Sequence, residues 1–173
     1  GTILLRQGEI CKIGCKVIAG CLKSYVLDDT GKEHIMQFAP EGWIITDMNS
    51  LFQQQSTFNE DISRWNVSSV INMNNMFNGC TAFDQPLDSW IVSKVTNMSY
   101  MFYGDASFNQ DLLMWDVSSV TNMSSMFQGC TAFKYLLEIW NTTTVTDMSG
   151  MFLNVGIVGI STIPVSGTPT ADH

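Results

Sequence analysis

The chain has 173 residues and a mass of 19.3 kDa, enough for one domain of ordinary size or one short repeat array. Hydrophobic residues make up 45% and charged residues 14%, below the roughly 25% of a typical globular protein, so general disorder is excluded. The net charge is −8, and residues 51–173 hold three bases against ten acids, which makes this part a poor partner for nucleic acid or an anionic membrane. No apolar run reaches the roughly 18 residues of a membrane-spanning helix.

The first 45 residues favour short β-strands separated by glycines. The sequence DDTG at residues 28–31 is typical of a hairpin turn. We therefore expect a small β-rich segment over residues 1–45, which would cap the N-terminal end of the remaining chain. Its strands are predicted over residues 3–6, 16–19, 22–27 and 33–38.

From Thr46 the sequence repeats every 25 residues without insertion or deletion. We number the positions of each repeat from 1 to 25, so that position 1 is Thr46, Ile71, Thr96, Thr121 and, in a partial fifth repeat, Thr146. Five columns never change over the complete repeats: Val closes each repeat at position 25, and the other four columns hold Met at position 3, Phe at positions 7 and 13, and Trp at position 20. These four columns are Met48, Met73, Met98, Met123 and Met148; Phe52, Phe77, Phe102, Phe127 and Phe152; Phe58, Phe83, Phe108 and Phe133; and Trp65, Trp90, Trp115 and Trp140.

A unit of 25 residues cannot bury its own apolar face, but stacked copies can share one core. We therefore predict a leucine-rich-repeat-like solenoid of four and a half coils over residues 46–152, each with a short strand and a short helical turn. The helical turn is expected at residues 123–129 and the strand at residues 108–115, with their equivalents in the other repeats. Propeller blades of about 40–50 residues and helical repeats of about 33 or more are too long to fit this period.

After Phe152 the periodicity ends. Residues 153–173 are predicted to form a C-terminal cap followed by a disordered tail.

The repeat pattern V-T-N-M-S-x-M-F-x-G-C-x-x-F-x-x-x-L-x-x-W-x-V-S-x-V resembles that of BspA-like leucine-rich-repeat surface proteins, including the mycoplasma-type surface-protein repeat. The resemblance covers residues 46–152. It implies a non-enzymatic interaction or adhesion module at a cell surface or outside the cell, binding a protein or cell-surface partner. No signal-peptide pattern occurs in the sequence.

The N-terminal sequence GTILLRQGEIC, followed from residue 17 by VIAGCLKSYVLDDTGKEHIMQFAPEGWIITDMNS, is the basis of a second resemblance. Over residues 1–52 the chain resembles part of the cyclic-nucleotide-binding-like β-roll of Crp/Fnr-type regulators. The phosphate-binding segment expected after Trp43 is absent, as is a helix-turn-helix, so no ligand-binding residue is assigned. This resemblance implies the alternative function, a truncated cyclic-nucleotide-sensing or regulatory module in the cytoplasm.

Nothing in the sequence points to catalysis, a cofactor or a metal. The two histidines are His34 and His173, and no nucleophile elbow, P-loop or zinc-protease motif occurs. Cys11, Cys15 and Cys21 match no zinc spacing. Cys80 and Cys130 share position 10 two repeats apart, about 9–10 Å at strand spacing, which is too far for a disulfide. We expect no enzyme, and we expect the polar ladder at position 2 to bond backbone groups rather than calcium.

The later repeats depart from the polar pattern at the positions expected to face outward beside the strand. In the first two repeats these positions are mostly polar, whereas in the third and fourth they become apolar. One hypothesis is a partner-binding surface, because contiguous exposed apolar residues often mark contact sites. The other is that residues 156–165 fold back over the same residues. The residues concerned are Leu113, Met114, Tyr135, Leu136 and Ile139.

Overall fold

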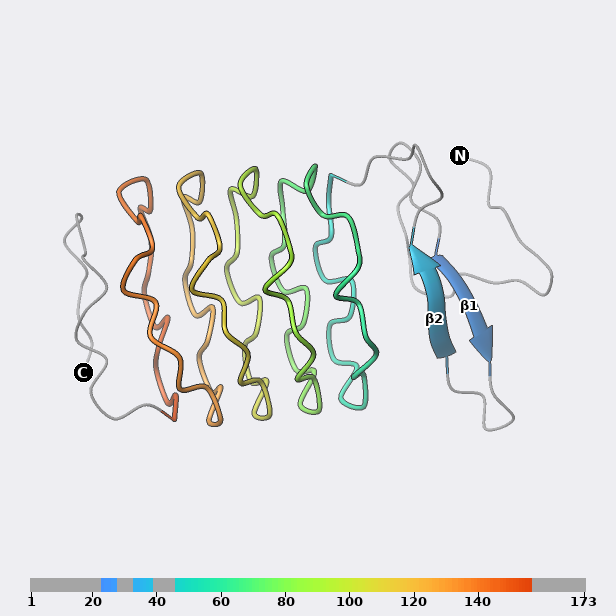
Figure 1. Cartoon of the computed structure of the whole chain (residues 1–173). Helices are drawn as coiled ribbons and strands as arrows, with labels where there is room; N and C mark the ends of the chain where they lie inside the picture. Colours follow the sequence, from blue (N-terminus) through green and yellow to red (C-terminus); the bar gives the residue numbers. More distant parts are fainter. Residues whose placement is uncertain (1–22, 28–32, 39–45, 157–173) are drawn as a thin grey trace. The chain divides into compact units, whose positions relative to one another are not determined.

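The computed structural model describes residues 23–27, 33–38 and 46–156 (Figure 1). The chain divides into two compact units, Gly1–Ile45 and Thr46–His173. In the first unit, β1 (Lys23–Leu27) pairs antiparallel with β2 (Glu33–Phe38). These are the expected hairpin strands. The turn between them, the strands predicted at residues 3–6 and 16–19, and residues 157–173 of the predicted C-terminal cap and tail lie outside the described residues.

The predicted solenoid of strand plus helical turn is wrong for residues 46–156. These residues contain no helix and no continuous strand, and their only β-pairing is a set of isolated bridges. The helical turn fails because positions 5 and 9 adopt the left-handed backbone conformation, for example Ser125 at φ 52° and Gly129 at φ 80°. A left-handed residue every fourth position interrupts a right-handed helix before it can propagate.

The predicted strand at residues 108–115 is also replaced by turns. The N–H of Leu113 donates to Oδ1 of Asp111 (2.9 Å), and the N–H of Trp115 donates to the carbonyl of Leu112 (3.0 Å). Both bonds bend the chain where a strand would remain extended. The bridges between repeats lie at position 2 instead, where Asn72, Asn97 and Asn122 pair in parallel.

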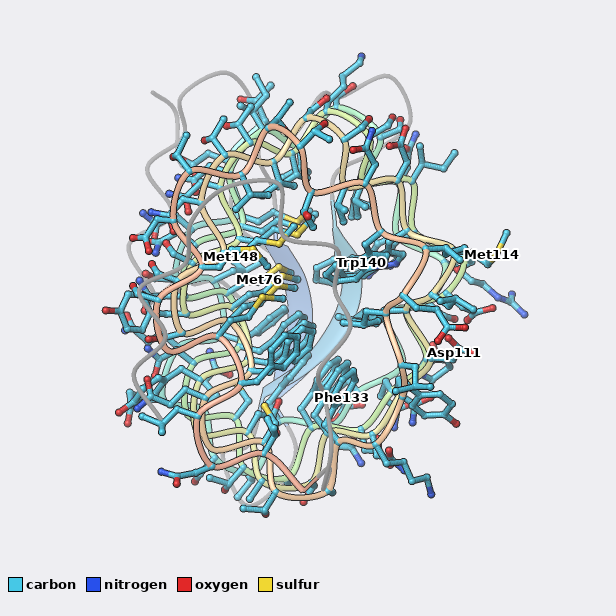
Figure 2. All side chains as sticks on the ribbon, turned by 90° about the vertical axis from the view of Figure 1, so that its left-hand side faces the viewer. Met76, Asp111, Met114, Phe133, Trp140 and Met148 are labelled. Atoms are coloured by element: carbon cyan, nitrogen blue, oxygen red, sulfur yellow. The ribbon has the colours of Figure 1, made fainter. Side chains whose placement is uncertain are left out.

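Each repeat is a series of tight turns, and several of these turns have buried first and fourth residues. In the third repeat the turn from Phe102 closes at Asp105 (3.0 Å), and the next closes at Phe108 (3.3 Å). A further turn joins Leu112 to Trp115. Because a β-turn brings its first and fourth residues together, the apolar columns spaced three apart meet inside the coil. Figure 2 shows Met76, Phe133 and Trp140 pointing into this interior.

Backbone hydrogen bonds join successive repeats along positions 3 to 9 (Figure 1). The N–H groups at positions 3, 5, 7 and 9 donate to carbonyls at positions 2, 4, 6 and 8 of the next repeat. Between the third and fourth repeats these bonds are Met98 to Asn122 (2.9 Å), Tyr100 to Ser124 (2.9 Å), Phe102 to Met126 (2.9 Å) and Gly104 to Gln128 (2.7 Å). The ladder explains why the period tolerates no insertion, because one extra residue would misalign every donor that comes after it.

The core is a pair of phenylalanine stacks. The ring of Phe102 lies 5.4 Å from Phe77 and 5.5 Å from Phe127, its counterparts in the neighbouring repeats. Within its own repeat it stacks on Phe108 at 4.0 Å. All four rings are fully buried. The repeated Phe columns therefore supply a continuous aromatic core that no single repeat contains.

The polar ladder at position 2 bonds backbone groups, as expected; its members are Asp47, Asn72, Asn97, Asn122 and Asp147. Oδ1 of each residue accepts a hydrogen bond from the backbone N–H two residues later. For example, the N–H of Ser99 donates to Asn97 (3.0 Å), and that of Ser124 donates to Asn122 (2.8 Å). These Asx turns fix the start of each repeat.

Candidate functional site

The turn from position 17 to position 20 places the candidate residues. It buries the Leu and Trp at its two ends, such as Leu112 and Trp115, and leaves the two residues between them exposed or half-buried. We call positions 16, 18, 19 and 21 of the second, third and fourth repeats the turn surface. It consists of Pro86, Asp88, Ser89, Ile91, Asp111, Leu113, Met114, Asp116, Leu136, Glu138, Ile139 and Asn141.

Large apolar side chains are exposed on the turn surface. Met114 is 79% exposed, Ile139 59% and Leu136 50%. Leu113 is half-buried. Tyr135, which comes just before the turn surface, is also half-buried, with its ring 6.4 Å from that of Phe133. The five residues selected from the sequence therefore divide into three exposed and two partly covered side chains.

Ile91 was missed by the sequence reasoning. It is 62% exposed at position 21, where the other repeats hold Asn66, Asp116 and Asn141. An apolar residue in an otherwise polar column was the signal that would have identified it.

The hypothesis that residues 156–165 cover these side chains falls almost entirely outside the described residues. Only Gly156 of that segment is described, and its N–H donates to the carbonyl of Cys130 (3.3 Å).

The turn surface carries four carboxylates and no basic residue. Asp116 accepts hydrogen bonds from the hydroxyl and N–H of Ser118 (2.6 and 3.1 Å), which hold the pKa of its carboxyl below the usual value. Oδ1 of Asp111 accepts the N–H of Leu113 (2.9 Å). Asp88 and Glu138 are both exposed. The surface is thus apolar and anionic together.

A shallow depression of about 350 Å³ adjoins the turn surface through Ser89 and Ile91. It lies mainly over the first repeat, where the half-buried Trp65 and the exposed Arg64 contribute to it. Its full lining is Ser63, Arg64, Trp65, Asn66, Val67, Ser68, Ser89 and Ile91.

The interior holds a second unusual group, at position 10. The thiols of Cys80 and Cys130 are buried and donate to the carbonyls of Phe52 (3.0 Å) and Phe102 (2.9 Å). Asp105 occupies the same position in the repeat between them, is 0% exposed, and neither carboxyl oxygen has a hydrogen-bond partner. Burial, and then the nearby charge of Asp84, raise the pKa of Asp105 to about 9, so it is uncharged at neutral pH.

This cluster is not a metal centre in the described part of the chain. No group of three or more His, Cys, Asp or Glu there is placed to hold an ion. Burial raises the pKa of Cys80 to about 12, and it also raises that of Cys130. Both thiols are therefore protonated and act as hydrogen-bond donors in the core.

These features define a protein of stacked 25-residue repeats with constant Met, Phe and Trp columns and an exposed turn whose residues vary. A family model described as "Mycoplasma protein of unknown function, DUF285" matches residues 32–135 and 108–157, which together cover more than half of the chain. The chain belongs to this family. The match agrees with the resemblance of residues 46–152 to a mycoplasma-type surface repeat, and nothing in the comparisons supports the resemblance to Crp/Fnr-type regulators.

No curated protein and no solved structure matches the chain. Among the described residues, no helix is long and apolar enough to cross a membrane.

Proposed function

We propose that this chain is a non-enzymatic protein-interaction module of the surface-repeat type, and that it binds its partner through the turn surface. The observation that supports this most is the exposure of Ile91, Met114, Leu136 and Ile139 on consecutive turns of one scaffold. Single exposed apolar residues are ordinary, whereas contiguous ones often mark a contact site.

The arrangement of the repeats brings these side chains together. Met114 and Ile139 share position 19 of consecutive repeats, whose Phe rings at position 13, Phe108 and Phe133, lie 6.0 Å apart. Burying one such side chain contributes about 1.5–3 kcal/mol. A partner that covers several of them at once therefore gains enough free energy to offset part of the cost of association.

The pattern of variation among the repeats also favours a binding role for the turn. The Met, Phe and Trp columns at positions 3, 7, 13 and 20 are constant because every repeat must fit the same stacked core. Position 19 instead holds Arg64, Ser89, Met114 and Ile139, which differ in size, charge and polarity. Binding residues are commonly carried on such variable segments of a rigid scaffold.

Selection from a random peptide library displayed on phage tests this function. We expect the enriched peptides to bind the double variant Met114→Ser/Ile139→Ser at least about tenfold more weakly than the unchanged protein. Tyr103→Ser is the matched control, because Tyr103 is also exposed in the third repeat but lies at position 8, outside the turn surface. Enriched peptides that bind the double variant and the unchanged protein equally would contradict the proposal.

The resemblance to mycoplasma-type surface repeats also supports display of this module outside the cell, with adhesion as one use. Labelling of intact cells with an antibody against residues 46–156 tests this location. Labelling that appears only after the cells are made permeable would contradict it.

A further inference from the structure

We infer that the partner of the turn surface is a cationic polypeptide segment in which Lys or Arg residues flank large apolar side chains. This inference rests on the proposed function, because it specifies the chemistry of the ligand for the same surface. It comes from the two properties that this surface combines, exposed apolar side chains and carboxylates without a basic partner.

The apolar side chains and the carboxylates occupy the same turns. Asp111 lies three positions before Met114, and Asp116 two positions after it. Figure 2 shows Asp111 and Met114 on the same side of the repeats, away from the core residues Met76 and Trp140. A segment that places an apolar side chain on Met114 therefore brings its neighbouring residues close to these carboxylates.

The carboxylates of the third repeat are already oriented for a cation. Oδ1 of Asp111 accepts a hydrogen bond from the N–H of Leu113 (2.9 Å). Oδ1 of Asp116 accepts hydrogen bonds from the N–H and the hydroxyl of Ser118. Oδ2 of each has no hydrogen-bond partner among the described residues, and both side chains are exposed. A bound Lys or Arg would meet a fixed acceptor rather than a freely rotating one.

The sign of the charge is consistent across the surface. Asp88 and Glu138 add two carboxylates at position 18 of the second and fourth repeats, and no base occupies any position of the turn surface. Arg64 at position 19 of the first repeat marks the N-terminal limit of this anionic region. A cationic segment is attracted over the second to fourth repeats, whereas at the first repeat the carboxylate of Asp61 already has a basic neighbour, Arg64, in the same turn.

A second copy of the chain fits this surface poorly. Pairing two turn surfaces would bury apolar side chains, but it would also bring four carboxylates of one copy against four of the other. Like charges across an interface disfavour association. The charge therefore favours a partner of opposite sign over self-association.

Fluorescence anisotropy with three short labelled peptides tests the inference. The probes alternate Lys with Leu, Glu with Leu, and Lys with Ser. We expect the Lys–Leu peptide to bind at least about tenfold more tightly than either of the others, with an affinity that falls as salt is added.

Variants assign the binding to the turn surface. Asp111→Asn/Asp116→Asn removes two charges, and the amide Oδ1 of each Asn can accept the local N–H that the carboxylate Oδ1 accepts now, so the turns remain intact. We expect this variant and Met114→Ser/Ile139→Ser each to weaken Lys–Leu binding at least about fivefold, and Arg64→Ser to strengthen it. Asp47→Asn is the control, because Asn already stands at position 2 in the second, third and fourth repeats.

The outcomes separate this inference from the proposed function. Equal binding of the Lys–Ser and Lys–Leu peptides would overturn the inference by showing that charge alone suffices. Equal binding of the Glu–Leu peptide, lost in Met114→Ser/Ile139→Ser, would overturn the cationic partner but support an apolar binding surface. Absence of Lys–Leu binding would also overturn the inference, whereas the proposed function would still be judged by the peptides selected from the random library.

Discussion

The indole nitrogen of Trp115 donates a hydrogen bond of 2.9 Å to the carbonyl oxygen of Leu87, at position 17 of the preceding repeat. The same bond joins Trp90 to Ile62 (3.1 Å) and Trp140 to Leu112 (3.0 Å). Position 17 begins the turn that carries the proposed binding residues and position 20 ends it. The Trp column therefore holds each exposed turn against its neighbour.

Replacing Trp115 by Phe should lower the free energy of unfolding by about 1–3 kcal/mol, because the buried carbonyl of Leu87 loses its hydrogen-bond donor. Chemical denaturation measures the effect. An unchanged midpoint and slope would show that the indole bond contributes nothing to stability.

Core and turn-surface methionines of the same repeat should respond very differently to substitution by Ser. Met101 is fully buried at position 6, whereas Met114 is mostly exposed at position 19. We expect Met101→Ser to lower the free energy of unfolding by about 2–5 kcal/mol. Met114→Ser should change it by less than about 0.5 kcal/mol. Thermal or chemical unfolding of the two variants compares them. A large loss for Met114→Ser would indicate that this side chain is buried and serves packing.

Position 9 should favour glycine because its backbone is left-handed. Gly104 has φ 70° and nothing lies within 4 Å of an added Cβ, so Gly104→Ala should cost about 1 kcal/mol from backbone strain alone. Gln54 occupies the same position at φ 62°. Gln54→Gly is the converse test and should stabilise the protein by a similar amount, measured by denaturant midpoint. If Gly104→Ala and Gln54→Gly changed the free energy of unfolding in the same direction and by the same amount, this explanation would be contradicted.

The buried carboxyl of Asp105 should make stability depend on pH. Its pKa is about 9 in the folded chain, against an ordinary value of 3.8, so between these values the folded state binds more protons than the unfolded state. The contribution of this group to stability is therefore greatest below about pH 4, falls as the pH rises towards 9, and levels off above that. Asp105→Asn should flatten this part of the profile and stabilise the protein at neutral pH.

Asp105→Cys gives a second measurement of the same effect. It restores the residue type of position 10 in the neighbouring repeats, where Cys80 and Cys130 donate to the carbonyls of Phe52 and Phe102. The new thiol should donate to Phe77, the equivalent residue. The exposed Asp116→Asn variant is the control. A pH profile of unfolding that is identical for Asp105→Cys and the unchanged protein would contradict a buried acid at this position.

The repeat length and the main core columns could be predicted from the sequence, because the stacked Met, Phe and Trp side chains recur at the same positions of every complete repeat. Met, Phe and Trp therefore mark the interior directly. The local backbone could not be predicted in the same way. Left-handed residues at position 5 include Ser50, Tyr100 and Ser125, which carry no glycine-like signal, so a series of turns was interpreted as one helical turn.

The candidate site was only partly predictable. Met114, Leu136 and Ile139 were found because they interrupt a polar pattern, and the same reasoning applied to position 21 would have found Ile91. Exposure itself depends on the turn from position 17 to position 20, which leaves its two central residues exposed or half-buried. The half-burial of Leu113 and Tyr135 depends on the detailed path of the chain, which the pattern of residue types does not contain.

Methyl resonances of methionine provide the most direct test of the turn surface. Met114 is the only methionine within residues 46–156 whose side chain is largely exposed, whereas those in the Met columns are buried or half-buried. Its resonance in a methyl-labelled sample is assigned by its loss in Met114→Leu. On titration with the Lys–Leu peptide we expect this resonance to shift to saturation while those of Met76 and Met98 stay in place. A Met114 resonance that does not move at saturating peptide would contradict binding at the turn surface.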